Sequence, residues 1–149
     1  MRYSAEVQLA TLWAMPGGDD LIRRCGGDPL FHDAELLSLR LAVNKPCSAL
    51  DVLWWPALCD GHPADHFVAA FDIEEVIDLE LTGFYTQNSL NDLLFYPAPD
   101  RPERAQYAAP SNGSDIEIAI NPHVGLGGWI RCRGVTIKTE SISVHDVAT

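Results

Sequence analysis

The chain has 149 residues, a length typical of one domain that buries a core without metal or disulfide bonds. Its composition, 47% hydrophobic and 21% charged, is that of a globular protein and excludes a disordered or fibrous chain. The formal net charge of −11 disfavours nucleic acid and anionic membrane as partners and favours a basic protein. We therefore expect a single domain over residues 1–149.

The first segment, residues 1–28, is predicted to be helical. Ser4 can cap a helix that runs to about Met15, and Pro16-Gly17-Gly18 ends it. A second short helix is expected between Asp19 and the glycine pair at 26–27, because acidic residues open it and two arginines close it.

The remaining chain, residues 35–144, is predicted to form an antiparallel β body. Residues 35–43 alternate in polarity, which predicts a strand with one buried face formed by Leu37, Leu39, Leu41 and Val43. Further strands are expected at 50–55, 66–73, 76–83, 90–96, 115–121, 129–132, 135–139 and 141–144. The fold class is therefore α+β and mainly β: an antiparallel sheet or two-sheet sandwich with one or two short N-terminal helices.

The connections between these strands are also predicted. Residues 97–114 contain four prolines and form a long loop, and Gly125–Gly128 is expected to be a tight hairpin. A turn that contains Asp72, Glu74 and Glu75 is expected to separate the strands at 66–73 and 76–83. A second hairpin is expected at Arg133-Gly134, and a bulge near Glu140.

The cysteines and the N-terminus suggest a location. The four cysteines form no C-x-x-C pair, so we interpret them as free, buried thiols: Cys25, Cys47, Cys59 and Cys132. The N-terminus lacks the pattern of a signal peptide, and no uncharged run is long enough to span a membrane. We expect a cytoplasmic protein that does not bind membranes.

One short cluster offers possible catalytic chemistry. His32, Asp33 and Glu35 could supply a general base or part of a metal site for a small hydrolase or metal-dependent enzyme. Adjacent residues of an extended chain point to opposite faces, and no second cluster supplies further ligands, which favours a simple turn. No catalytic or phosphate-binding motif stands out, so we expect no enzyme activity, no cofactor and no metal.

The acidic charge is concentrated in one stretch of the sequence. Between Pro46 and Asp100 there are ten acidic residues and no Lys or Arg. On strands, alternate carboxylates share a face, and a face without cations attracts a basic protein. The predicted partner-binding residues are Asp72, Glu74, Glu75, Asp78, Glu80, Asp115 and Glu117.

Two motifs carry a resemblance to a known family. Residues 31–39 read F-H-D-A-E-L-L-S-L, and residues 78–90 contain D-L-E-L-T-G-F followed by Q-N-S-L. The chain thereby resembles the bacterial immunity protein 50 family of polymorphic toxin systems, over about residues 31–94 and less clearly over 125–137. The motif residues are Phe31, His32, Asp33, Glu35, Gly83, Phe84, Gln87 and Asn88.

The resemblance implies a small cytoplasmic, non-catalytic protein that binds and neutralises a cognate toxin. Neither motif is catalytic. Gln87 and Asn88 are interpreted as structural, because their amides can satisfy backbone groups at a strand junction. The first hypothesis is therefore an inhibitor that covers a basic toxin surface, and the alternative is the enzyme built on the His32 cluster.

Overall fold

Two short helices precede the strands, as the sequence predicts. The computed structural model describes residues 4–42, 48–54, 66–111 and 113–142. Helix α1 (Ala5–Trp13) begins at Ser4, whose hydroxyl accepts a hydrogen bond from the Val7 amide. Helix α2 (Gly18–Cys25) has acidic residues in its first turn and arginines in its last, and Gly26 ends it in the left-handed conformation.

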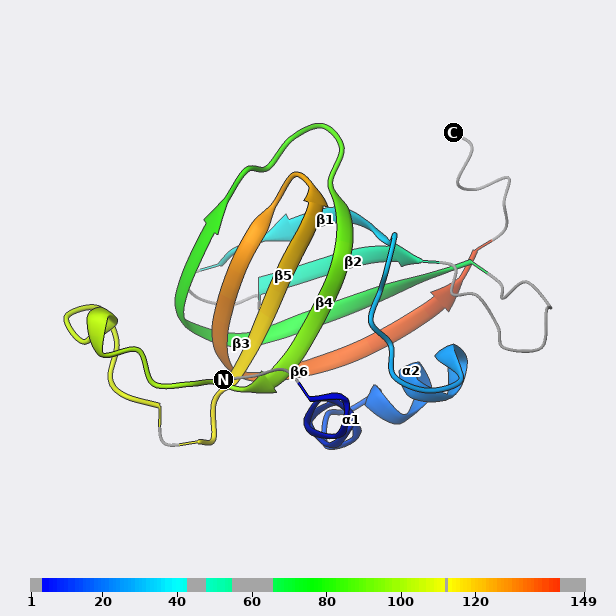
Figure 1. Ribbon diagram of the computed structural model, residues 1–149. Helices are drawn as coiled ribbons and strands as arrows, with labels where there is room; N and C mark the ends of the chain where they lie inside the picture. The colour runs from blue at the N-terminus through cyan, green and yellow to red at the C-terminus, as the bar shows by residue number, and fades with distance from the viewer. Residues whose placement is uncertain (1–3, 43–47, 55–65, 112, 143–149) are drawn as a thin grey trace.

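Six antiparallel strands close into a barrel with the order β1-β2-β3-β6-β5-β4 (Figure 1). Their bounds are β1 (Glu35–Arg40), β2 (Ser48–Trp54), β3 (Phe67–Thr82), β4 (Ser89–Pro97), β5 (Ile116–Val124) and β6 (Gly127–Ser141). The protein is thus mainly β with two short helices. The loop after β4 contains a single 3-10 turn, η1 (Pro102–Arg104).

Strand β3 supplies the clearest hydrophobic face of the barrel. Phe67, Ala69, Phe71 and Ile73 are all fully buried, as the alternation predicts. The aromatic rings pack inside the barrel: Phe71 stacks on Phe95 at 5.1 Å between ring centroids. Each fully buried Phe or Ile stabilises the fold by about 1.5–3 kcal/mol, so these positions fix which face of β3 points inward.

The predicted turn before Val76 is not present, because β3 runs unbroken from Phe67 to Thr82. A bulge takes its place: the pairing with β6 shifts between Val76 and Asp78, and Glu75 has a positive φ of 49°. The prediction of two separate strands was wrong here. A bulge changes which alternate side chains of a strand face inward, and in the sequence this change looks the same as a turn between two strands.

The predicted hairpin at Arg133-Gly134 is also wrong. Strand β6 continues through it, and Gly134 pairs with Glu74 of β3. The pairing is regular around Glu140, so the bulge expected there is absent. The hairpin expected at Gly125–Gly128 is confirmed, since it joins β5 to β6 with Gly125 at a φ of 95°.

The inward face of β1 differs from the prediction. Leu36 is buried, whereas Leu37 and Leu41 are about half exposed, and Val43 lies outside the described residues. A register shift between Leu36 and Ser38 changes which alternate residues of β1 point inward. The shift lets the Leu36 amide donate a hydrogen bond to the Asn88 carbonyl at 2.8 Å, where β1 meets β4 and closes the barrel.

The helices cover an edge that the strands leave open. Strand β5 pairs with β6 only as far as Cys132, so the second half of β6 has β3 on one side only. The loop between the helices occupies the other side: the Ile137 amide donates to the Pro16 carbonyl at 2.8 Å. Gly17 is required there, because a Cβ would lie 1.8 Å from the Ile137 carbonyl oxygen.

Gln8 joins α1 to the barrel. Its buried side chain accepts a hydrogen bond from the Phe95 amide at 2.8 Å and donates to Asp28 at 2.9 Å. In Figure 1 both helices lie at the lower end of the barrel, and the β3–β4 turn lies at the upper end. The barrel therefore has a helical end and a free end.

We expect Gln8→Leu to lower the free energy of unfolding by about 1–3 kcal/mol, because the buried Phe95 amide loses its acceptor. Urea denaturation followed by circular dichroism measures the change. Gln106→Leu is the matched control at an exposed position, with an expected change within about 0.5 kcal/mol. Equal effects of the two substitutions would contradict the role of Gln8.

Candidate functional site

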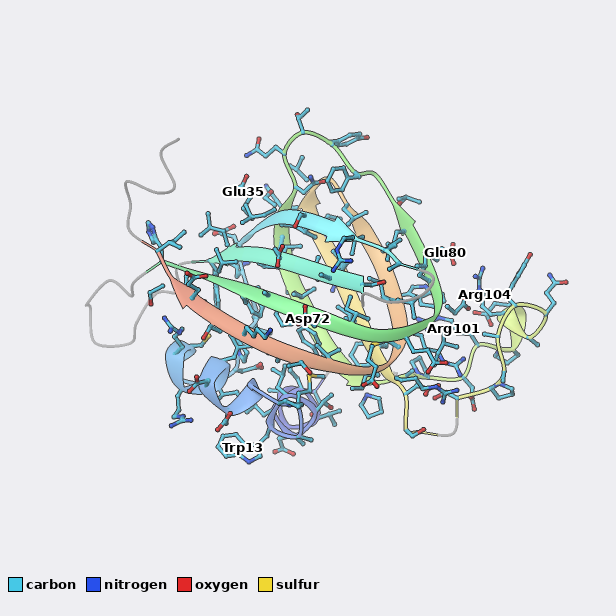
Figure 2. All side chains as sticks on the ribbon, turned by 180° about the vertical axis from the view of Figure 1, so that it is seen from behind. Trp13, Glu35, Asp72, Glu80, Arg101 and Arg104 are labelled. Atoms are coloured by element: carbon cyan, nitrogen blue, oxygen red, sulfur yellow. The ribbon has the colours of Figure 1, made fainter. Side chains whose placement is uncertain are left out.

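Four of the predicted partner-binding carboxylates lie on the outside of β3. Glu74, Glu75 and Glu80 are exposed, and the Asp72 side chain is about half exposed. Figure 2 shows Asp72 and Glu80 at separate points along the strand. Because β3 bends between them, these residues do not form one compact acidic patch.

Cations from the last third of the chain pair with most of the predicted partner-binding carboxylates. Five of the seven predicted residues form ion pairs: Asp72 with Lys138, Glu75 with Arg133, Asp78 with Arg104, Asp115 with Arg131 and Arg133, and Glu117 with Arg101. Of the ten acidic residues between Pro46 and Asp100, Asp72, Glu75 and Asp78 are paired in this way within the described residues.

Asp115 and Glu117 are buried, which corrects the expectation that they face a partner. Their side chains are 2% and 0% exposed. Glu117 lies on the outer side of β5, where Arg101 of the loop at 97–111 covers it. Asp115 lies just before β5, where Arg131 and Arg133 of β6 cover it. The Asp78 side chain is only 8% exposed for the same reason. These three carboxylates therefore belong to the internal packing of the protein.

Glu117 is the most enclosed of the three. Both of its oxygens accept hydrogen bonds from the Arg101 guanidinium, and one also accepts from the Tyr96 hydroxyl. Burial raises the pKa of Tyr96, and the hydrogen bond to the anionic carboxylate adds to the effect. The Arg101 guanidinium also lies 3.9 Å from the centre of the Trp129 ring.

Two further arginines hold the same loop against the strands. Arg104 donates two hydrogen bonds to Asp78, at 3.0 and 2.6 Å. Arg131 of β6 donates to Asp115 at 2.9 Å and to the Ala109 carbonyl at 2.7 Å. The loop is therefore fixed at both ends by charge-assisted hydrogen bonds rather than by an apolar core of its own.

A second cluster forms at the free end of the barrel, around Asn88. Its buried side-chain oxygen accepts hydrogen bonds from the amides of Tyr85 and Leu126, and its amide nitrogen donates to the Tyr85 carbonyl. Its backbone carbonyl accepts from Leu36 of β1. Asn88 thus joins three segments, which agrees with the structural role predicted for it. Gln87 is exposed.

Large apolar side chains are exposed on all three segments that Asn88 joins. Phe84 and Tyr85 of the β3–β4 turn are 57% and 64% exposed, and Val124 and Leu37 are also exposed. Gly83 allows the close approach: it has a φ of 83°, and a Cβ would lie 2.9 Å from the Gly125 carbonyl oxygen. We call Leu37, Phe84, Tyr85 and Val124 the apolar tip.

His32 and Asp33 lie in the turn before β1, and Glu35, the third member of the His32 cluster, is exposed at the start of β1, where it pairs with Ser89 of β4. His32 and Asp33 side chains are 65% and 80% exposed, with 3.5 Å between His32 Nε2 and Asp33 Oδ2. Phe31 and Asp33 have positive φ, so the segment is a tight turn. Within the described part of the chain, no three His, Cys, Asp or Glu side chains are placed to hold a metal ion.

The described cysteines are not poised as nucleophiles. Cys25 and Cys132 are free, and burial raises the pKa of each thiol to about 12. Cys47 and Cys59 lie outside the described residues. Of the helices described, none has the length and apolar character needed to cross a membrane.

Comparison of the chain with family models, with curated proteins and with solved structures finds no match. The resemblance to the immunity protein family and the partner-binding role of the acidic residues accordingly stay predictions. Tyr85, Val124 and the arginines of the loop were not among the site residues predicted from the sequence. The adjacent aromatics after Gly83 were the one available signal for the apolar tip.

We expect Glu117→Gln to lower the free energy of unfolding by about 3 kcal/mol. This value is the lower end of the stability loss expected when a buried ion pair is broken, because the Arg101 side chain is partly exposed to water. Glu75→Gln is the matched control: it removes an exposed pair at 3.7 Å, which is worth about 0–1 kcal/mol. Urea denaturation compares the two, and an equal loss would show that Glu117 is not specially buried.

The pKa of the Asp78 carboxyl makes the free energy of unfolding depend on pH. The hydrogen bond from Arg104 holds the pKa of Asp78 below its usual value, so the native protein binds this proton more weakly than the unfolded chain. The stability from this group is present above about pH 4, the unfolded pKa, and is lost as the pH falls through the lower native pKa.

We therefore expect Asp78→Asn to reduce the loss of unfolding free energy between about pH 5 and pH 2. Urea denaturation at a series of pH values measures the slope. Asp33→Asn, which removes a carboxylate on an exposed side chain, tests whether the loss of any carboxylate has this effect. An unchanged slope in Asp78→Asn would contradict the assignment.

Proposed function

We propose that this protein is a non-catalytic immunity protein that binds and neutralises a cognate toxin in the cytoplasm. The observation that carries the proposal is the apolar tip, where Phe84 and Tyr85 stand exposed on a turn that Asn88 holds in place. Exposed aromatics on a rigid support are typical of the residues that dominate protein interfaces. The resemblance of the two motifs to immunity proteins points in the same direction.

The position of the apolar tip suits an interface. It lies at the end of the barrel opposite the helices, and Figure 1 shows the β3–β4 turn projecting there beside the β5–β6 hairpin. A standard interface covers about 800 Å² on each partner, so the tip can form its centre and the neighbouring strand ends its rim. The hydrogen bonds of Asn88 pre-organise the turn, which lowers the entropy lost on binding.

Fewer acidic residues can attract a basic partner than the sequence predicts. Glu80 is exposed near the end of β3 and precedes Phe84 by four residues. Glu74 is also exposed but lies beyond the bulge. Asp72 and Glu75 form long surface pairs of 3.7 Å, which a basic partner can replace at little cost. A basic toxin surface would thus be attracted by Glu80 and steered more weakly by the others.

The alternative enzyme has less support from the geometry. A catalytic pair is expected to line a concave pocket with at least one group desolvated. His32 and Asp33 are largely exposed, and the cavity described below lies at the loop of residues 97–111 instead. We therefore assign the His32 turn to the fold, where the Trp54 indole donates a hydrogen bond to the His32 carbonyl at 2.9 Å.

Co-expression with the product of the neighbouring toxin gene tests the proposal. We expect the wild-type protein to rescue growth and to form a complex with the toxin. The double substitution Phe84→Ala, Tyr85→Ala should weaken the complex at least about 100-fold, as loss of two aromatic anchors does. Trp13→Ala is the matched control, because Trp13 is equally exposed but lies on α1 at the helical end (Figure 2).

Glu80→Lys should slow association and weaken its dependence on salt, whereas Glu6→Lys on α1, with the same change in charge, should not. Stopped-flow or surface plasmon resonance measures the rates. Failure of the wild-type protein to rescue growth or bind the toxin would overturn the immunity proposal. Rescue and binding that survive loss of Phe84 and Tyr85 would instead move the interface away from the apolar tip.

A further inference from the structure

A cavity lies between the loop at 97–111 and the outer side of the barrel. Its volume is about 300 Å³, and its walls include Pro99, Pro102, Ala108, Arg101, Arg104 and Trp129. Figure 2 shows Arg101 and Arg104 beside this loop, away from the apolar tip and from the helices. A cavity of this size is within the range of sites for small molecules.

The cavity is pre-formed rather than created by a mobile loop. Glu117, Asp78 and Asp115 fix its arginines from beneath, and Arg131 also holds the Ala109 carbonyl. The prolines restrict the φ angles of the loop, and the alanines lining it keep side-chain volume low. The walls therefore lose little conformational entropy when a ligand enters.

The polar groups at the cavity are mainly hydrogen-bond donors. Each guanidinium carries five N–H groups. Arg101 directs two of its nitrogens at Glu117, and Arg104 uses its Nε and one terminal nitrogen for Asp78 and Leu79. Within the described residues, each arginine thus has N–H groups left for a ligand, whereas the acceptors at Asp78 are already bonded.

Planar side chains at the cavity restrict the shape of the ligand that can bind there. Trp129 forms one wall, and the Arg101 guanidinium lies 3.9 Å from its ring centre. Such planar surfaces favour a planar ligand, which stacks with little loss of contact. The three lining arginines are paired with Glu117, Asp78 and Asp115, so a ligand is recognised by the N–H groups left over and not by a net positive charge.

We propose that this cavity binds a small planar molecule, neutral or singly negative, whose ring bears hydrogen-bond acceptors. The ring lies against Trp129 between the alanine and proline walls, and its acceptors meet the unused N–H groups of Arg101 and Arg104. This site is separate from the apolar tip, so it stands whether or not the protein binds a toxin.

Three fragments with one ring test the proposal: benzoate, benzamide and benzylamine. They are titrated into the full-length protein and followed by ¹H–¹⁵N NMR, with the Trp129 indole signal assigned through Trp129→Phe. We expect benzoate and benzamide to give saturable shifts at the Trp129 indole and at the Ala108 and Ala109 amides. Benzylamine should bind at least about tenfold more weakly, because its ammonium group offers no hydrogen-bond acceptor to the unused N–H groups of the arginines.

Ala108→Phe fills the cavity and should weaken benzoate binding at least about tenfold, whereas Gln106→Phe on the same loop should not change it. Ala105→Phe, which also narrows the cavity, replaces Ala108→Phe if that variant fails to fold. Three results would each overturn the proposal: no saturable shift at Trp129, equal binding of benzylamine, or full benzoate binding by the filled variant.

Discussion

The continuous pairing of β3 with β6 is the constraint on which the rest of the structure depends. The two strands stay in register from Phe67 to Thr82, except for one shift between Val76 and Asp78. Because both bend together, their first and second halves belong to opposite sides of the barrel. The remaining strands then pair with one half or the other, and the loop between the helices covers the edge of β6 that β5 leaves unpaired.

The same pairing decides the electrostatics of the protein. It sets the acidic β3 beside β6, which carries Arg131, Arg133 and Lys138. Buried aromatic and aliphatic positions are worth about 1.5–3 kcal/mol each, whereas exposed ion pairs are worth about 0–1 kcal/mol. The register is therefore set by the apolar inward face, and the outer charges pair as that register allows. The buried pairs under the loop at 97–111 are the exception, because there one uncompensated partner is costly.

The two proposed sites lie on parts of the surface that the barrel keeps apart. The apolar tip depends on Asn88, whose hydrogen bonds hold the β3–β4 turn against the β5–β6 hairpin. The cavity depends on Glu117 and Asp78, which hold Arg101 and Arg104 of the loop, and on Asp115, which holds Arg131 of β6. At each site the hydrogen-bonding groups of a buried polar side chain are satisfied by neighbouring residues. Buried polar groups that are satisfied in this way favour one arrangement of the chain.

The sequence by itself determined the local elements: both helices with their caps, the inward residues of β3, the proline-rich loop and the hairpin at Gly125–Gly128. These depend on neighbours within a few residues, which the sequence displays directly. Only the tertiary structure decided that β3 and β6 run on through a bulge, that Leu36 rather than Leu37 faces inward, and that Asp115 and Glu117 are buried. The reason is physical: parity at a bulge and the neutralisation of a charge both depend on a partner strand or loop distant in the chain, and the sequence does not show which residues will meet.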